Sequence, residues 1–289
     1  MLGLLIFGLA NSMGLALAAL GFSFVFGISG IANFAYGAFY LLGGFIVYIL
    51  LNSFGLPYWI AAIISVVVVF FLGALTYKIA IQRIRGAMLS EVIVTMGLGV
   101  AIVEILRGSG YVKHNQYLPA FAPGSVMIAG LGVEYQRLLI IVIGLVLFLF
   151  LWIFTRYTKI GLAFRAMSQD EMTALSLGMN SNQLAMISMG IGSALAVIAA
   201  LSIIPLGLLT VEGAYEILIF ALAVGVLGGL GSTIGIIVGA FVLGYAQSIV
   251  ATVLSPQWMM VVTFLIIVLV LLVKPSGIFG QQKELEERV

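Results

Sequence analysis

Residues that could carry out chemistry are few in this chain, and they form no catalytic constellation. The sequence has no cysteine and one histidine, His114, so it excludes thiol catalysis and thiolate metal sites, and His114 alone cannot build a metal site. It contains no G-x-S-x-G, no H-E-x-x-H and no G-x-x-x-x-G-K-[ST] motif. We therefore expect no enzyme activity and no cofactor bound by this chain. If ATP drives its function, a separate subunit must bind the nucleotide.

Carboxylates inside apolar stretches are the next candidates, because such groups often couple transport to an ion. Glu212 and Glu216 are four residues apart and share one face if their stretch is helical. They either line a substrate pathway or cap a helix that re-enters the membrane. Glu104 and Arg107 have the spacing of a pair within one helix. An ion-coupled carrier normally has more acidic residues at mid-membrane, so it remains an alternative rather than the main hypothesis.

Uncharged polar residues are also rare in the first apolar stretches. Asn11, Asn33 and Tyr36 are the main examples. Such side chains often form hydrogen bonds between neighbouring helices, and they can also line a substrate path. Both interpretations remain open for these three residues.

Composition places these residues in a membrane. The chain of 289 residues is 63% hydrophobic and 8% charged, whereas soluble domains have about 25% charged residues. The prediction is an all-α, polytopic transmembrane bundle of eight or nine spans that forms a single domain over residues 1–289. Whether there are eight spans or nine depends on residues 205–228, which are predicted to form a broken or re-entrant segment. The expected spans are 1–28, 38–51, 58–77, 90–106, 138–154, 184–204, 233–253 and 259–273.

Basic residues predict the orientation of the bundle. Lysine and arginine concentrate on the cytoplasmic side of membrane proteins. Nine of the twelve fall into three groups that can share one side. That arrangement leaves the other three outside, with the N-terminus outside and a charged C-terminal tail, residues 274–289, in the cytoplasm. The cytoplasmic groups are Lys78, Arg83 and Arg85; Arg156, Lys159 and Arg165; and Lys274, Lys283 and Arg288; the outside residues are Arg107, Lys113 and Arg137.

A polar stretch from Lys159 to Asn182 interrupts the apolar sequence. Ser168 and Glu171 have the spacing of a capping box, and Gly178 stands where a helix would end in a left-handed turn. The pattern predicts one short helix of about ten residues with an apolar strip at Met172, Leu175 and Met179. Because a helix this short is marginal alone in water, we expect it to dock on a partner. Ser90 gives a similar start signal for the helix that follows the first basic group.

Three stretches together resemble the permease subunits of branched-chain amino acid ABC transporters. The first is GLALAALGFSFVFGISGIANFAYGAFYLLGGF, residues 14–45, and the third is VLGGLGSTIGIIVGAFVLG, residues 226–244, with KPSGIFG at 274–280. The second lies in the polar stretch and matches G-x-A-x-R-A-x(4)-D-x(3)-A-x(3)-G. The residues that match in this chain are Gly161, Ala163, Arg165, Ala166, Asp170, Ala174 and Gly178.

The resemblance implies a role for the polar stretch and a set of partners. Residues 158–182 would be the coupling segment that meets a cytoplasmic ATP-binding subunit, and the residues expected to carry coupling are Gly161, Arg165, Ala166, Asp170, Ala174 and Gly178. A second permease subunit, identical or homologous, and an external substrate-binding protein would complete an importer in the cell membrane. Nucleic acid is not an expected partner.

The cargo follows less directly from the resemblance. The family commonly has His and Glu where this chain has Tyr36 and Ala38, and Glu216 lies near a position where a basic residue is common. Branched-chain or related amino acids are therefore the first expectation. Urea, short amides or another small polar solute are the alternatives.

Overall fold

The computed structural model describes residues 2–109, 116–128, 130–274 and 276–280. The described residues do not include Lys113, His114, Lys283 or Arg288, so the predictions for these four positions lie outside the structure described here. The elements in chain order are α1 (Leu2–Ser29), α2 (Tyr36–Asn52), α3 (Tyr58–Thr76), the π-helix η1 (Tyr77–Ile81), α4 (Met88–Gly108), β1 (Ser125–Ile128), β2 (Leu131–Glu134), α5 (Tyr135–Tyr157), α6 (Lys159–Gln169), α7 (Glu171–Ser176), α8 (Ser181–Ile203), the 3-10 helix η2 (Ile204–Leu206), α9 (Val211–Gly228), α10 (Thr233–Val253) and α11 (Trp258–Val273).

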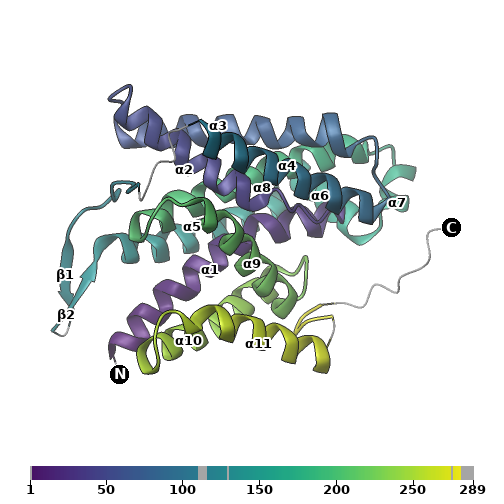
Figure 1. The fold of residues 1–289 in the computed structure, drawn as a ribbon. Coiled ribbons are helices and arrows are strands. Elements are labelled where there is room, and N and C mark those ends of the chain that lie inside the picture. The colour runs from purple at the N-terminus through teal and green to yellow at the C-terminus, as the bar shows by residue number, and fades with distance from the viewer. Residues whose placement is uncertain (1, 110–115, 129, 275, 281–289) are drawn as a thin grey trace.

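Helices long and apolar enough to cross a membrane dominate the structure. Seven helical stretches of the described chain meet that description, and α2 and α11 are shorter apolar helices. This confirms a helical, multi-pass membrane protein. A short antiparallel hairpin of β1 and β2, in which Val126 pairs with Val133, interrupts the otherwise helical chain. The hairpin lies at one end of the bundle and α7 at the opposite end (Figure 1).

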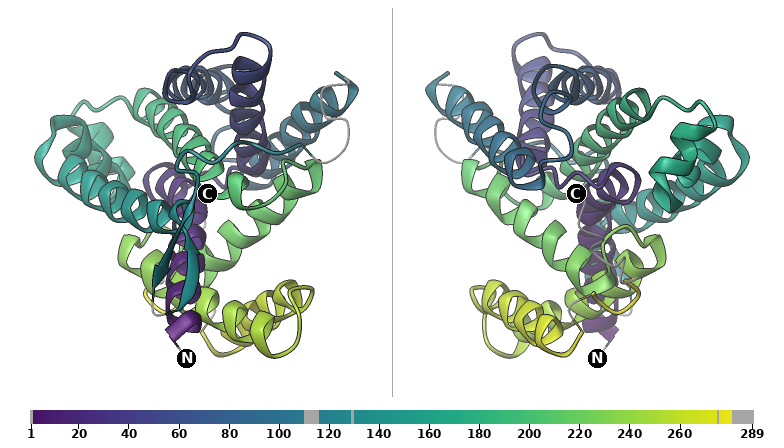
Figure 2. Two further views of the ribbon diagram at one scale, coloured as in Figure 1. Left: turned by 90° about the vertical axis from the view of Figure 1, so that its left-hand side faces the viewer. Right: turned by 90° about the vertical axis from the view of Figure 1, so that its right-hand side faces the viewer.

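Helix α1 lies at the centre of the bundle. It packs against α8, α9 and α10 (Figures 1 and 2). Ala16, Ala18 and Ala19 on this helix are completely buried. Side chains this small let helix backbones approach closely, which is how membrane helices gain packing energy without a hydrophobic driving force between them. The central helix therefore holds the other elements in place.

Glycines make the closest of these approaches. A Cβ on Gly244 of α10 would overlap the backbone and side chain of Ser12 in α1. Gly235 of α10 lies against the Gly228 carbonyl at the end of α9 in the same way. Substituting either glycine would force these helices apart.

Residues 30–35 separate α1 from α2 and form the first break in the bundle. The Asn33 Oδ1 accepts a hydrogen bond from the Ala35 amide at 3.1 Å, and the Phe34 amide donates to Thr95 Oγ1 of α4 at 3.2 Å. These contacts satisfy backbone groups that would otherwise be left unpaired inside the membrane. The Phe34 amide thus holds this break against Thr95 of α4, and Asn33 braces the turn that leads into α2.

Residues 204–210 form a second break, between α8 and α9. The Leu209 amide donates to the Gln116 carbonyl at 2.9 Å, which ties this break to the connection between α4 and β1. Thr210 then caps α9, because its hydroxyl oxygen accepts a hydrogen bond from the Gly213 amide at 3.2 Å. The expected interruption within residues 205–228 is therefore present before α9, and residues 211–228 form one continuous helix.

The start of α4 differs from the expectation for Ser90. The helix begins at Met88, and its N-cap position is Ala87. Gly86 has a φ of 95°, and this left-handed residue turns the chain into the helix three residues earlier than an N-cap at Ser90 would. Glu91 is 5% exposed, and its carboxylate accepts a hydrogen bond from the Gly86 amide at 2.8 Å. Glu91 thus contributes to the helix start in place of Ser90.

Candidate coupling segment and transport cavity

The candidate coupling segment, residues 158–182, contains two short helices rather than the single one expected. Thr158 caps the first of them, α6, through a hydrogen bond from the Gly161 amide to its hydroxyl oxygen at 2.9 Å. A Cβ on Gly161 would overlap the carbonyl of Phe154 in α5. Glycine at this position of the motif is therefore required for α6 to fold back directly against α5.

Asp170, and not Ser168, caps the second helix, α7. Its Oδ1 accepts hydrogen bonds from the amides of Met172 at 2.9 Å and Thr173 at 3.2 Å. Ser168 is still inside α6, where its hydroxyl donates to the Arg165 carbonyl at 2.9 Å. The chain becomes extended only at Asp170, with φ −152° and ψ 109°, so only this residue has the backbone conformation that an N-cap needs.

Gly178 ends the helix α7, as expected. Its φ of 82° is left-handed, and its amide donates to the Leu175 carbonyl at 2.9 Å. Asn180 then caps α8 by accepting a hydrogen bond from the Gln183 amide at 3.1 Å. The last motif residue of the segment therefore turns the chain from α7 into α8.

The segment has a buried apolar side that holds it on the bundle. Phe164 and Met167 of α6 and Ala174 of α7 are at most 3% exposed. They form a cluster with Ile28 at the end of α1, and Phe164 packs edge-on against Phe24 with ring centroids 5.7 Å apart. Ala166 lies partly buried beside this cluster. Burial of these apolar side chains stabilises the two helices, which would be too short to remain folded alone in water.

The other side of the segment is exposed. Met172 and Leu177 are 74% and 72% exposed, and Leu175 is 44% exposed. Arg165 and Asp170 are exposed as well. Of the strip expected at Met172, Leu175 and Met179, the first two side chains are therefore turned outward, and only Met179 packs against the buried cluster. Docking on the bundle relies mainly on Phe164, Met167 and Ala174. We name the exposed side chains of Met172, Leu175 and Leu177 the outer apolar patch.

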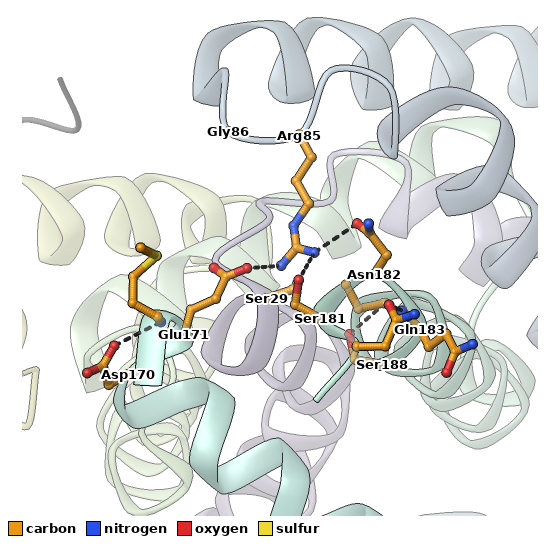
Figure 3. Close-up of polar contacts among 12 residues, drawn as sticks. Ser29, Arg85, Gly86, Asp170, Glu171, Ser181, Asn182, Gln183 and Ser188 are labelled. Atoms are coloured by element: carbon orange, nitrogen blue, oxygen red, sulfur yellow. Dashed lines mark hydrogen bonds and ion pairs between the residues drawn. The ribbon is translucent and has the colours of Figure 1, made fainter. Parts of the chain in front are cut away.

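Arg85 connects the segment to a different part of the bundle (Figure 3). It lies in the turn between η1 and α4, and its guanidinium forms an ion pair with Glu171 at 2.7 Å. It also donates to Ser181 Oγ at 2.9 Å and to Asn182 Oδ1 at 3.0 Å. The sequence identified Arg85 only as one of a group of cytoplasmic basic residues. No local pattern pointed to a partner 86 positions away.

A cavity of about 490 Å³ lies elsewhere in the bundle, between α1, α2, α5, α9 and the break at residues 204–210. Asn11 and Glu216 are among the residues that line it. Tyr40, Arg137 and Gln247 add polar groups, and leucine, isoleucine and phenylalanine side chains form most of the remaining wall. Such a wall, apolar with a few polar groups, is typical of sites for small ligands.

The other predicted pathway residues are not among those that line this cavity. Glu212 is exposed in the first turn of α9. Asn33 and Tyr36 are completely buried near the first break, where Tyr36 packs edge-on against Phe22 with ring centroids 6.1 Å apart. The structure thus brings Asn11 and Glu216 together and leaves these three outside the cavity wall.

Asn11 also belongs to a hydrogen-bonded chain across three helices. Its Nδ2 donates to Gln247 Oε1 of α10 at 3.1 Å, and Gln247 Nε2 donates to Thr263 Oγ1 of α11 at 2.8 Å. Gln247 is 1% exposed and Thr263 is completely buried. Neither residue was predicted from the sequence, although a lone glutamine within an apolar span is a signal that points to Gln247. Asn11 therefore joins helices and lines the cavity at once.

Two further ion pairs within the described residues are local. Arg107 pairs with Glu104 at 2.8 Å, which confirms the pair predicted from their spacing. Arg137 pairs with Glu134 at 3.1 Å. Both arginines are three residues from their partners, so these pairs hold no distant elements together.

Comparisons with known proteins find the same family that the three sequence stretches resemble. The family described as "Branched-chain amino acid transport system / permease component" matches residues 4–271. The chain is 30% identical over 292 residues to the high-affinity branched-chain amino acid transport system permease protein BraD of Pseudomonas aeruginosa, covering 96% of this chain and 95% of BraD. It is 26% identical over 289 residues to the corresponding permease protein LivM of Salmonella typhimurium, covering 90% of this chain and 66% of LivM.

The fold has a counterpart among solved structures. A chain of PsaBC from Streptococcus pneumoniae, solved in complex with Fab, matches with a TM-score of 0.51 and 15% sequence identity. The match covers 96% of this chain and 94% of that one, so the helical arrangement is shared over nearly the whole length. On the family match and the identity to BraD, this chain belongs to the permease components of branched-chain amino acid transport systems.

Proposed function

We propose that this chain is the permease subunit of an ABC importer that carries branched-chain or related amino acids across the cytoplasmic membrane. Separate subunits bind the ATP, and an external protein delivers the substrate. The observation that carries the proposal is the coupling segment, which is capped, docked on the bundle through Phe164 and Ala174, and apolar on its outward side. The relatives BraD and LivM, named as branched-chain amino acid permeases, support the choice of cargo.

The outer apolar patch is the proposed contact with the ATP-binding subunit. Met172, Leu175 and Leu177 expose apolar area beside the charges of Arg165 and Asp170. A small apolar centre with a charged rim is the usual composition of a protein–protein interface. When two ATP-binding subunits close on ATP, the docked segment transmits their movement to the bundle, which alternates its access by rearrangement of packed helices.

The cavity is the proposed section of the substrate pathway. Glu216 supplies a carboxylate, Asn11 and Tyr40 supply polar groups, and the apolar wall suits an aliphatic side chain. The break at residues 204–210 borders the cavity through Leu206 to Thr210. We assign this break to a segment that dips into the membrane from the outside, so that α9 begins within the bilayer. Asn33 and Tyr36 shape the neighbouring break at residues 30–35.

The remaining partners follow from the same proposal. The second permease subunit is an identical copy or a homologue such as a LivM-like chain, since relatives of two different lengths match this sequence. Apolar side chains of α3, α5 and α11 are largely exposed and face lipid or that subunit. We place the coupling segment in the cytoplasm and the β-hairpin outside, on the distribution of basic residues.

Uptake by the reconstituted transporter tests the proposal. The permease would be assembled with its ATP-binding subunits in liposomes and given labelled leucine on its binding protein. We expect uptake that requires both ATP and the binding protein, and competition by isoleucine and valine. If only urea or short amides compete, those solutes are the transported substrates. Uptake driven by a proton or sodium gradient without ATP would overturn the importer assignment and favour a secondary transporter.

A further inference from the structure

Arg85 holds together three elements: its own turn between η1 and α4, the helix α7, and the start of α8. Its guanidinium reaches Glu171 in α7, and Ser181 and Asn182 in the first turn of α8. Tyr77 of η1 completes the group, because its hydroxyl donates to Asn182 Oδ1 at 2.9 Å and accepts from Arg85 at 3.3 Å. Figure 3 shows the guanidinium between Glu171 on one side and Asn182 on the other.

The geometry of this group is that of a rigid connection rather than a surface ion pair. The Arg85 side chain is 15% exposed and that of Glu171 is 28% exposed. The guanidinium is planar and presents its donors in a fixed fork, so several bonds at once define the relative orientation of the partners. By contrast, Arg107 and Glu104 are about half exposed and lie in one helix. Of the three ion pairs among the described residues, only Arg85–Glu171 joins distant segments.

The apolar contacts of the coupling segment leave a gap that Arg85 fills. Phe164, Met167 and Ala174 contact α1, α5 and α8. The helices α3 and α4 are not represented in that cluster. Arg85 lies in the turn that joins η1, the continuation of α3, to α4. It therefore supplies the polar link between the coupling segment and the α3–α4 pair.

The geometry points to Arg85 as a positioning residue for energy coupling. It clamps α7 to the turn between η1 and α4, so that a displacement of α7 moves the α3–α4 pair together with α8. This inference rests on the proposed role of residues 158–182 as the coupling segment. Without the clamp, ATP hydrolysis by the partner continues, while the movement of α7 reaches α3 and α4 only through the packing of α8 against α3.

The ratio of substrate moved to ATP hydrolysed tests this role, because a loss of folding alone would not change it. The Arg85→Gln variant removes the charge and the fork, and we expect at least a tenfold lower ratio with ATP-binding subunits still bound. Arg85→Lys keeps the charge but not the fork and should give an intermediate ratio. Arg107→Gln, which breaks a local pair only, is the matched control and should stay within twofold of wild type. A wild-type ratio in Arg85→Gln would overturn the clamp.

A pair of charge-reversal variants tests the clamp even if the Arg85→Gln variant does not fold. Arg85→Glu should abolish coupled uptake, and adding Glu171→Arg should restore at least a fifth of it by rebuilding the pair in the opposite sense. Equal loss in the single and double variants would overturn the clamp.

The absence of cysteine allows a direct test of joint movement. Cysteines at positions 85 and 171, joined by a short thiol-reactive linker, should transport better than the same variant without the linker. A linker that stops transport would show that the two elements must separate, and would overturn the clamp.

The proposed role of residues 158–182 in coupling has its own test, with a different outcome. If Asp170→Lys and Arg165→Glu both keep wild-type uptake, residues 158–182 are not a coupling segment at all.

Discussion

Gly37 in the first turn of α2 lies directly against the backbone carbonyl of Ala214 in the first turn of α9. A Cβ at position 37 would overlap that carbonyl oxygen. Both helices begin just after a break, residues 30–35 in one case and 204–210 in the other. The first turns of the two helices therefore meet backbone to backbone, and a movement of one helix start must move the other. This contact also lies beside the cavity wall, since Tyr40 and Gly213 line it.

Replacement of Gly37 by alanine should loosen this contact. The added methyl has no room, so we expect the free energy of unfolding to fall by about 1–3 kcal/mol, as for other overpacked sites. Thermal unfolding of the purified protein in detergent would measure the loss. Gly97→Ala is the matched control, because Gly97 lies in α4 with no atom near its missing side chain. It should be neutral or slightly stabilising, since alanine favours a helix by about 1 kcal/mol over glycine. Equal melting temperatures for the two variants would contradict the packing argument.

Replacement of Asp170 separates its capping role from its charge. Asp170→Ala removes the acceptor for the Met172 and Thr173 amides, and loss of such a cap costs about 1 kcal/mol. We expect faster hydrogen exchange across residues 171–176 and reduced uptake. Asp170→Asn keeps an acceptor without the charge and should retain slow exchange. If Asp170→Asn exchanges as fast as Asp170→Ala, the cap is not what keeps α7 folded.

Much of the fold could be predicted from the sequence, because hydropathy and length determine where a helix can cross a membrane. The expected spans overlap the observed apolar helices, and Gly178 ends α7 as predicted. The predicted capping box at Ser168 and Glu171 was wrong, because Asp170 caps α7 instead. Ser168 and Asp170 are both good N-cap residues, and tertiary docking through Phe164 and Ala174 decided which one the chain left extended.

The candidate site was only partly predictable. Its motif positions from Gly161 to Gly178 fall on the docked segment, whereas Arg85 and Gln247 were missed as site residues. Local periodicity carries no information about contacts such as Arg85 with Glu171 or Asn11 with Gln247, which join segments far apart in the sequence. For the same reason the spacing of Glu212 and Glu216 placed them on one helix face without showing that only Glu216 reaches the cavity.

Replacement of Asn33 tests whether the first break is structural. Its side chain is completely buried, and its Oδ1 accepts from the Ala35 amide. Asn33→Ala would leave that amide unpaired, at a cost of about 1–3 kcal/mol. We expect a lower melting temperature with an unchanged KM for uptake. Asn33→Ser, whose uncharged hydroxyl oxygen can still accept from the Ala35 amide, is the control for the lost hydrogen bond. A raised KM at normal stability would instead place Asn33 in the substrate pathway, which is the other of the two interpretations that the sequence left open.

The two glutamates of α9 provide the sharpest test of the transport cavity. Glu216→Gln and Glu212→Gln make the same chemical change four residues apart, but only Glu216 lines the cavity. A carboxylate there can pair with the ammonium group of an amino acid, and hydrogen bonds to charged groups contribute about 1.5–3 kcal/mol. Because Glu216 is exposed, solvent screening reduces this. We expect about a fivefold rise in KM for leucine in Glu216→Gln, consistent with a loss of about 1 kcal/mol. Glu212→Gln should stay within twofold of wild type. Equal effects of the two variants would mean that the carboxylate acts through the overall charge of α9 and not through the cavity.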